Sequence, residues 1–298
     1  MNTKVTIAGV ELKNPVMTAS GTFGSGMEYS EFTDLNKLGA VVTKGVSNVA
    51  WPGNPTPRVA EVTGGMLNAI GLQNPGVDVF IERDIPFLKK FDTKIIVNVC
   101  GHSVEEYVET VEKLNDQPVD MYEINVSCPN VKVGAIQFGQ DAKTLEGVTK
   151  EIKARSKKPV IMKLSPNVTS IKDMAMAAEA GGADAISLIN TLIGMKIDIY
   201  RKKFVLANKT GGFSGPAVKP VAVRMVYDAA HSVSIPVIGM GGIATAEDAI
   251  EFMMAGATAV SVGTMNFAEP MTTSMVVDGI AEYMQSQGLN DINDIVRL

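Results

Sequence analysis

Short apolar segments that alternate with helix-like segments are the feature of this sequence that most limits its fold. Eight such segments are rich in Val, Ile, Leu and Ala and carry few charges, as strands buried on both faces do. They are residues 16–19, 39–43, 94–99, 122–126, 159–164, 185–189, 235–239 and 259–262. Because parallel strands need crossover connections, this alternation predicts a parallel sheet covered by helices.

Eight strand–helix units in roughly 250 residues match the size of a (β/α)8 barrel, which is the fold we expect. The alternative is an open, doubly wound sheet, but no glycine-rich dinucleotide fingerprint follows the first strand. Residues 3–7 and 10–12 flank Ala8-Gly9 and predict a short β-hairpin before the barrel. No repeat or linker interrupts the chain, so we expect a single domain over residues 1–298.

Helical patterns fill most of the intervals between the expected strands. They cover residues 28–38, 77–90, 104–114, 142–156, 170–180, 216–232, 246–255 and 271–287. Ser103 with Glu106 three residues on has the spacing of a capping box, and Thr245 with Asp248 marks the start of another helix. Residues 47–75 and 192–215 instead predict long irregular loops. Long ordered loops in compact domains are usually functional, and residues 66–76 could fold over a ligand.

Polar side chains collect where the expected strands end. In a (β/α)8 barrel these carboxyl ends meet on one face and form the active site. The residues there are Ser20, Lys44, Asn98, Asn125, Cys128, Lys163, Asn190, Thr191, Gly241, Gly242, Gly263 and Thr264. A lysine that ends a buried strand is costly unless it has an anionic partner or a polar pocket. The ends therefore predict a site with two cations and several amides, unless the lysines extend outward to water.

The loops after the last two strands predict a phosphate site. Gly241-Gly242 follow a strand and precede a helix, and Gly263-Thr264 likewise follow the next strand along the chain. Exposed backbone N–H groups and a helix dipole favour a phosphate at such positions. The alternative is that the glycines only make tight turns.

Cys128 follows the fourth strand and precedes Pro129, which biases the cysteine away from helical geometry. The thiol is thus presented on a turn, either as a reactive group beside a ligand or as a half-buried loop residue. A site with cations, amides, a phosphate cradle and one thiol could hold a phosphorylated cofactor with an electron-accepting ring. Cys128 would then be the proton acceptor. Cys100, beside Asn98, is expected to be a small core residue.

Several classes of protein are disfavoured by the sequence. The net charge of −5 argues against a nucleic-acid or anionic-membrane partner. Two cysteines make no disulfide framework, and no metal-ligand spacing is visible, so we expect no metal. No run of about 18 apolar residues predicts a membrane span. The first residues resemble neither a signal nor a transit peptide, so we expect a cytoplasmic protein. Neither a G-x-S-x-G motif nor a Walker loop occurs.

Taken in sequence order, eight motifs resemble those of the class 1 dihydroorotate dehydrogenases. They are SGTFG, TKG, NAIGLQNPG, NVSCPN, KLSPN, SLINT, IGMGGI and SVGT. The likeness covers essentially the whole chain. The opening LKNPVMTASGTFGSG is most similar to the catalytic subunits of the NAD-linked, class 1B enzymes.

This resemblance implies an FMN-binding barrel that oxidises dihydroorotate to orotate in pyrimidine biosynthesis. Cys128 would take the proton from carbon 5 while hydride leaves carbon 6 for the flavin. The pyrimidine and its carboxylate would be held by Lys44, Asn68, Ala69, Ile70, Gly71, Leu72, Asn125, Asn190 and Thr191. The flavin would be lined by Ser20, Lys44, Gly45, Asn98, Asn125, Lys163, Ile189 and Gly215, with Gly241, Gly242, Gly263 and Thr264 at its phosphate.

The same resemblance implies a second subunit that carries FAD and a [2Fe–2S] cluster, in a heterotetramer built on a homodimer of this chain. The sequence departs from the family pattern at Gly134-Ala135, where two glycines are usual in the loop that closes over the substrate. Other readings remain open: a class 1A-like enzyme that reduces fumarate alone, and a flavin barrel for another pyrimidine. A Schiff-base aldolase using Lys163 and a phosphate-binding barrel without activity are further alternatives.

Overall fold

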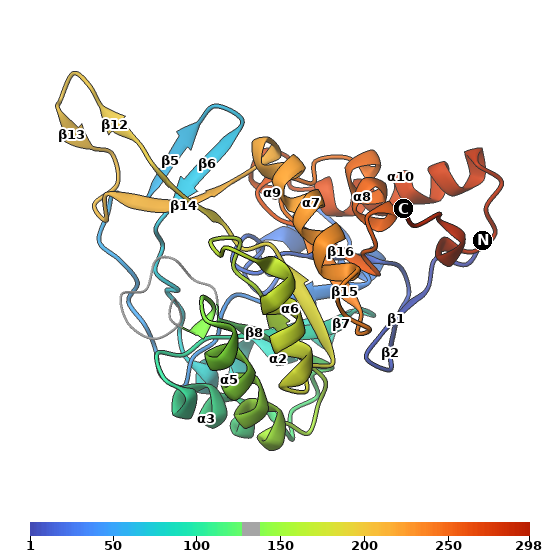
Figure 1. Cartoon of the computed structure of the whole chain (residues 1–298), viewed down its shortest axis with the longest axis horizontal. Coiled ribbons are helices and arrows are strands. Elements are labelled where there is room, and N and C mark those ends of the chain that lie inside the picture. The colour runs from blue at the N-terminus through green and yellow to red at the C-terminus, as the bar shows by residue number, and fades with distance from the viewer. Residues whose placement is uncertain (127–137) are drawn as a thin grey trace.

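Eight parallel strands close into a barrel in the computed structural model of this chain, which describes residues 1–126 and 138–298 (Figure 1). In chain order they are β3 (Val16–Thr18), β4 (Ala40–Val42), β7 (Lys94–Val99), β8 (Met121–Asn125), β9 (Val160–Lys163), β10 (Ala185–Leu188), β15 (Val237–Met240) and β16 (Ala259–Val262). The last strand pairs with the first, with Ser261 opposite Met17. All eight expected strands and the (β/α)8 fold are confirmed, and the open sheet is excluded.

Helices cover the outside of the barrel, because each buries one apolar stripe against the strands (Figure 1). They are α3 (Val104–Leu114), α5 (Ala142–Arg155), α6 (Ile171–Ala180), α7 (Lys219–Ala230), α8 (Ala246–Met254) and α10 (Thr272–Ser286). In α5 the buried side chains include Leu145, Val148 and Ile152, spaced as one face of a helix requires. A short helix, α9 (Met265–Ala268), was not predicted from the sequence. The hairpin of β1 (Val5–Ile7) and β2 (Val10–Leu12) is confirmed.

The two helix starts marked in the sequence are capped to different degrees. At the start of α8 the Thr245 hydroxyl accepts the Asp248 N–H, and the Asp248 carboxylate accepts the Thr245 N–H. At the start of α3 the Ser103 hydroxyl accepts the Glu106 N–H, but the Glu106 carboxylate bonds the N–H of His102 instead. The capping box expected at Ser103 and Glu106 is therefore only half formed, whereas the helix start expected at Thr245 is confirmed and carries a complete box.

The helix expected over residues 28–38 is wrong. Two 3₁₀ turns stand there, η1 (Tyr29–Glu31) and η2 (Leu35–Lys37). Asp34 lies between them in an extended conformation, and its carboxylate accepts the N–H of Asn36. This local bond competes with a continuous helix, so the helical periodicity of residues 28–38 does not produce one.

The helix expected over residues 77–90 forms with a wide turn inside it. α1 (Val77–Val79) runs into the π-helical segment η3 (Phe80–Asp84) and then into α2 (Ile85–Leu88). Pro86 has no N–H to donate to the preceding turn, and a π turn is one way for a helix to accommodate such a gap.

The two stretches expected to be irregular are instead paired with each other. They supply a four-stranded antiparallel sheet in the order β11 (Leu192–Met195), β14 (Thr210–Ser214), β6 (Gly65–Asn68), β5 (Val59–Val62). Figure 1 shows this sheet to one side of the barrel, with the small hairpin of β12 (Ile197–Asp198) and β13 (Lys203–Phe204) extending beyond it. Glycines in these strands hid them from sequence analysis. Gly211 shows the reason for glycine, because a Cβ there would lie 2.6 Å from Leu206 and 2.7 Å from the Asn68 carbonyl.

Candidate active site

A cavity of about 590 Å³ lies between the carboxyl ends of the barrel strands and the four-stranded sheet. Most of the residues singled out in the sequence line it. These are Ser20, Lys44, Gly45, Asn68, Ile70, Gly71, Leu72, Asn98, Asn125, Lys163, Ile189, Asn190, Thr191, Gly241, Gly242, Gly263 and Thr264. The expectation that distant strand ends and loops converge is therefore confirmed, while their individual roles stay predictions.

Two described residues of the expected set do not line the cavity. Ala69 is buried in a small core with Ala60 and Leu67 beneath the sheet. Gly215 lies next to the cavity wall, where its carbonyl would be 3.0 Å from a Cβ on Gly242. Cys128 lies outside the described residues, as do residues 131–137 of the loop over residues 131–139 that the resemblance expects to close over the substrate. The sequence reasoning missed several lining residues, including Ser214 and Phe213 of β14 and Ser261 of β16. Those on β14 were missed because that strand was not predicted.

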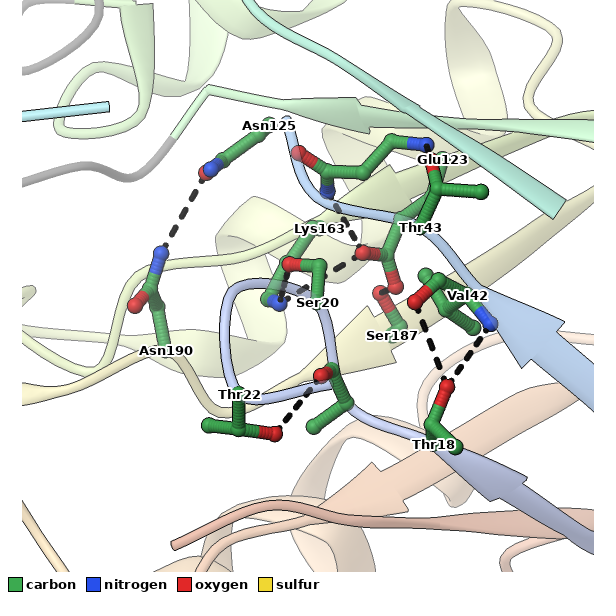
Figure 2. Close-up of polar contacts among 12 residues, drawn as sticks. Thr18, Ser20, Thr22, Val42, Thr43, Glu123, Asn125, Lys163, Ser187 and Asn190 are labelled. Carbon is green, nitrogen blue, oxygen red and sulfur yellow. Dashed lines mark hydrogen bonds and ion pairs between the residues drawn. The ribbon is translucent and has the colours of Figure 1, made fainter. Parts of the chain in front are cut away.

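Lys163, which lines the cavity, forms an ion pair with a carboxylate beneath the cavity that the sequence reasoning did not foresee. Glu123, on β8, is 1% exposed, and its Oε1 lies 3.4 Å from the Nζ of Lys163. The Lys163 ammonium also donates to the Ser20 hydroxyl at 2.9 Å (Figure 2). Lys163 is 4% exposed, so it does not extend outward to water. It has the anionic partner that a buried lysine requires.

The same carboxylate bonds two further strands. Its Oε1 accepts the Asn98 amide N–H at 2.7 Å, and its Oε2 accepts the Ser187 hydroxyl at 3.0 Å. A glutamate within the apolar run MYEIN was a signal that could have found it. Glu123 and Asn125 alternate with apolar residues and so point to the same side of the strand.

Two residues that line the cavity each carry a buried polar atom without a hydrogen-bond partner among the described residues. These atoms are the Oδ1 of Asn98 and the hydroxyl of Ser261. Since the amide nitrogen of Asn98 is held by Glu123, its oxygen is left to accept a bond from elsewhere. Buried polar atoms are almost always paired in proteins, so these two indicate a ligand with hydrogen-bonding groups.

Amide side chains meet across one wall of the cavity. The Asn190 amide N–H donates to the Asn125 Oδ1 at 3.2 Å (Figure 2). The Asn190 Oδ1 also accepts the Thr191 N–H at 2.8 Å. The hydroxyl of Tyr107 donates to the Asn125 carbonyl at 2.8 Å. These bonds fix the two amides that the sequence predicted for substrate recognition. An asparagine can both donate and accept, so the pair can match a ring with N–H and C=O groups.

Glycines at the opposite wall allow close approach to the backbone. Gly241 has φ +123° and Gly242 has φ +86°, conformations that other residues rarely adopt. A Cβ on Gly242 would lie 2.8 Å from the Cβ of Lys219. Nearby, the Thr264 hydroxyl donates to the Ser214 hydroxyl at 2.8 Å. This geometry fits the expected anion cradle, since only glycine leaves the backbone N–H groups accessible.

Lys219, which lies against Gly242, is held in place by two carboxylates. The Nζ of Lys219 lies 2.6 Å from Asp248 and 2.7 Å from Glu251. Asp248 also accepts the N–H groups of Ala244 and Thr245. Burial opposes ionisation of Asp248, but these hydrogen bonds outweigh it and hold the pKa of the carboxyl below its usual value.

Replacement of Asp248 by asparagine should lower the free energy of unfolding at pH 7 by about 1 kcal/mol, the usual worth of a helix cap. The stabilisation from a carboxyl with a lowered pKa is present above the unfolded value of 3.8 and is lost as the pH falls through the folded value. The difference from the parent protein should therefore shrink in acid. Denaturant titrations at pH 7 and below pH 3.8 would measure it. Glu247→Gln, on the same helix but without the Lys219 contact, is the control. Equal stability of D248N and the parent at pH 7 would contradict the role.

The described part of the chain contains no group of three His, Cys, Asp or Glu side chains that could hold a metal ion. Within that same part, none of the helices has the length and apolar character needed to cross a membrane.

Comparison with known proteins gives a consistent result. Residues 2–284 match the family model described as dihydroorotate dehydrogenase. A protein of Lachnoclostridium phytofermentans is 68% identical over 296 residues, which are 99% of both chains. One of Alkaliphilus metalliredigens is 62% identical over 295 residues, covering 99% of this chain and 98% of the relative. Both are named dihydroorotate dehydrogenase B (NAD(+)), catalytic subunit.

Among solved structures, DHODH from Eimeria tenella in complex with ferulenol has a TM-score of 0.83. It is 22% identical, and the match covers 100% of this chain and 88% of that one. At this identity the likeness supports the barrel fold and nothing finer.

Proposed function

This chain belongs to the dihydroorotate dehydrogenase family, and on that premise we propose that it is an FMN-containing catalytic subunit of the NAD-linked class. It is a flavin-dependent oxidoreductase that oxidises dihydroorotate in pyrimidine biosynthesis, as its named relatives at 68% and 62% identity are. A Schiff-base aldolase and a phosphate-binding barrel without activity are therefore not retained. The identity of the flavin, the role of each residue and the partner are parts of the proposal.

One observation carries the choice of FMN: a single cavity combines a buried amide oxygen without a partner and a glycine cradle. Its volume of about 590 Å³ is within the range usual for cofactor sites. Asn98 Oδ1 would accept a ring N–H of the flavin, and Gly241 and Gly242 would bind its phosphate. Ser20, Lys163 and Ile189 would lie along the ring between these ends.

When bound, FMN supplies the electron-pair acceptor for the hydrogen that leaves carbon 6 of dihydroorotate. Lys44 and Lys163 bring positive charge to the cavity wall, which favours negative charge that develops in front of them. Asn68, Asn125 and Asn190 would hold the N–H and C=O groups of the pyrimidine. The four-stranded sheet covers the cavity through Met66 and Phe213 and so limits access of water.

We assign the proton at carbon 5 to Cys128. Its thiolate would accept that proton, the C5–H and C6–H bonds would break, and the C5=C6 double bond of orotate would form. Support for this step comes from the sequence, since Cys128 is the third residue after Asn125, which ends β8. Asn125 itself lines the cavity, so only two residues of sequence separate that wall residue from Cys128.

The electrons would leave through a second protein. The relatives are named catalytic subunits of NAD(+) enzymes, which implies a partner. This chain has two cysteines, too few for the four ligands of a [2Fe–2S] cluster. We therefore propose a partner that carries FAD and the cluster, in a heterotetramer with two copies of each subunit. A cytoplasmic location stays a prediction.

The purified chain should be yellow with an FMN spectrum, and dihydroorotate should bleach it without oxygen. Reduction of NAD⁺ should be negligible until the partner subunit is added, because the route from the flavin to NAD⁺ is incomplete. Absorbance at the flavin and NADH bands measures both steps, with fumarate as the control acceptor. A colourless protein would contradict the function, and efficient fumarate reduction by the chain alone would contradict the NAD-linked class.

A further inference from the structure

Glu123 is a buried carboxylate that the proposed reaction does not use. It does not line the cavity but lies directly beneath it, among β7, β8, β9 and β10. An ionised carboxylate that is 1% exposed is costly unless it is paired and hydrogen-bonded. A hydrophobic residue of similar size would fill the same space without that cost. The role of the buried carboxylate is therefore to be found in the side chains that it holds.

Each partner of Glu123 is buried, and two of them line the cavity. Asn98 lies opposite Glu123 in the register of β7 and β8, and its amide nitrogen is bound at 2.7 Å. That bond decides which end of the amide stays available, because it holds the nitrogen and leaves the oxygen without a partner beside Gly45, which lines the cavity. The Glu123 carboxylate thereby sets the hydrogen-bonding character of Asn98 as an acceptor.

Lys163 is held between two partners rather than collapsed onto the carboxylate. Its Nζ lies 2.9 Å from the Ser20 hydroxyl and 3.4 Å from Glu123 Oε1. Figure 2 shows the ammonium between these two partners. Ser20 lines the cavity, so the ammonium is directed toward it. Ser187 binds the other carboxylate oxygen at 3.0 Å and leaves Oε1 for Asn98 and Lys163. The pair carries no net charge, and the negative member is the farther from the cavity.

We propose that Glu123 is a positioning residue that orients Asn98 and Lys163 toward the cofactor and, by offsetting the lysine charge, sets the potential at which the cofactor accepts electrons. This inference rests on the proposed function. Positive charge near a flavin favours its reduced, negatively charged form. Without the Glu123 charge, Lys163 would act uncompensated in a poorly hydrated site, where charges interact strongly.

The first test compares Glu123→Gln with Glu123→Asp in the FMN-loaded protein. Gln keeps the size and an acceptor oxygen for Asn98 but removes the charge, whereas Asp keeps the charge. We expect E123Q to favour the reduced flavin by about tenfold, which is roughly 30 mV for two electrons. In E123D the ratio of reduced to oxidised flavin should stay within about twofold of that in the parent. Equilibration with a redox dye gives the potential, and quenching of FMN fluorescence gives the dissociation constant.

A merely structural role would produce a different pattern. It would weaken FMN binding in both variants and leave their potentials equal to that of the parent, which would overturn the proposal. Ser187→Ala is the matched control, because it removes one bond to Glu123 and no charge. S187A should leave the ratio of reduced to oxidised flavin within about twofold of the parent, even if its melting temperature falls.

If E123Q does not fold, the variants K163Q and E123Q/K163Q test the same inference. Lys163→Gln should favour the oxidised flavin by about tenfold, and the double variant E123Q/K163Q should return close to the parent. A double variant whose flavin potential stays as low as that of K163Q would overturn the inference. Failure of the parent chain to bind FMN would overturn the proposed function as well. Normal FMN binding with an unchanged potential in the variants would overturn this inference alone.

Discussion

Replacement of Cys128 by serine is expected to slow reduction of the bound flavin by dihydroorotate by about 10²–10⁴-fold at neutral pH, the usual worth of a general base. The reason is the acidity of the side chain. A thiol with an ordinary pKa near 8.5 supplies some thiolate at neutral pH, and a nearby cation increases that fraction, whereas a serine hydroxyl stays protonated. The flavin should remain bound, because the proposed role of Cys128 is toward the substrate.

Stopped-flow absorbance in the absence of oxygen measures this rate directly. In the parent the rate should rise with pH until the thiol is ionised, and in the serine variant the rise should move to higher pH. The other cysteine of the sequence provides a matched control. Cys100 is fully buried beside Leu72, so Cys100→Ala removes a thiol of the same chain and should leave the reduction rate within a few-fold. Unchanged kinetics in Cys128→Ser would remove this residue from the mechanism.

Replacement of Gly242 by valine should raise the dissociation constant of FMN by about 100-fold or more, which corresponds to the loss of one or two charged hydrogen bonds. A side chain cannot be added here without displacement of the loop. At φ +86° a Cβ would lie 2.8 Å from the Lys219 Cβ, 2.9 Å from its backbone nitrogen and 3.0 Å from the Gly215 carbonyl. Lys219 is itself held by Asp248 and Glu251, so the neighbour cannot easily move.

The control for this variant is Gly147→Ala, in the exposed middle of α5. A Cβ there meets nothing within 4 Å, and the backbone is helical. That variant should bind FMN as the parent does and unfold with about 0.5–1 kcal/mol more free energy, as alanine stabilises a helix interior. Fluorescence titration measures FMN binding, and denaturant unfolding without FMN separates a lost cradle from a lost fold. Normal FMN binding by a folded G242V would contradict the cradle.

The strands of the barrel were predictable because each is buried on both faces. A run such as VIMK in β9 or AISL in β10 has no solvent-facing position, so composition alone identifies it. The antiparallel sheet was not predictable in the same way. Its strands carry Gly65, Gly194, Gly211 and Gly212, which the packing of the sheet requires but which lower every local preference for a strand.

The candidate site divides along the same line. Lys44, Asn98, Asn125, Lys163 and Asn190 could be found from the sequence, since parallel strands deliver their ends to one face. Ala69 could not be distinguished from its neighbours, because whether it faces the cavity or the small core depends on the pairing of β6.

The sequence alone thus determined the fold class, the family and the strand ends that meet, because these depend on local hydrophobicity and on motifs read in order. Only the tertiary structure decided which polar groups pair beneath the cavity. Glu123 meets Asn98 and Lys163 through the register of β7, β8 and β9, although they are 25 and 40 positions away in the sequence. Register between distant strands is a property of the closed barrel, and no local pattern in the sequence encodes it.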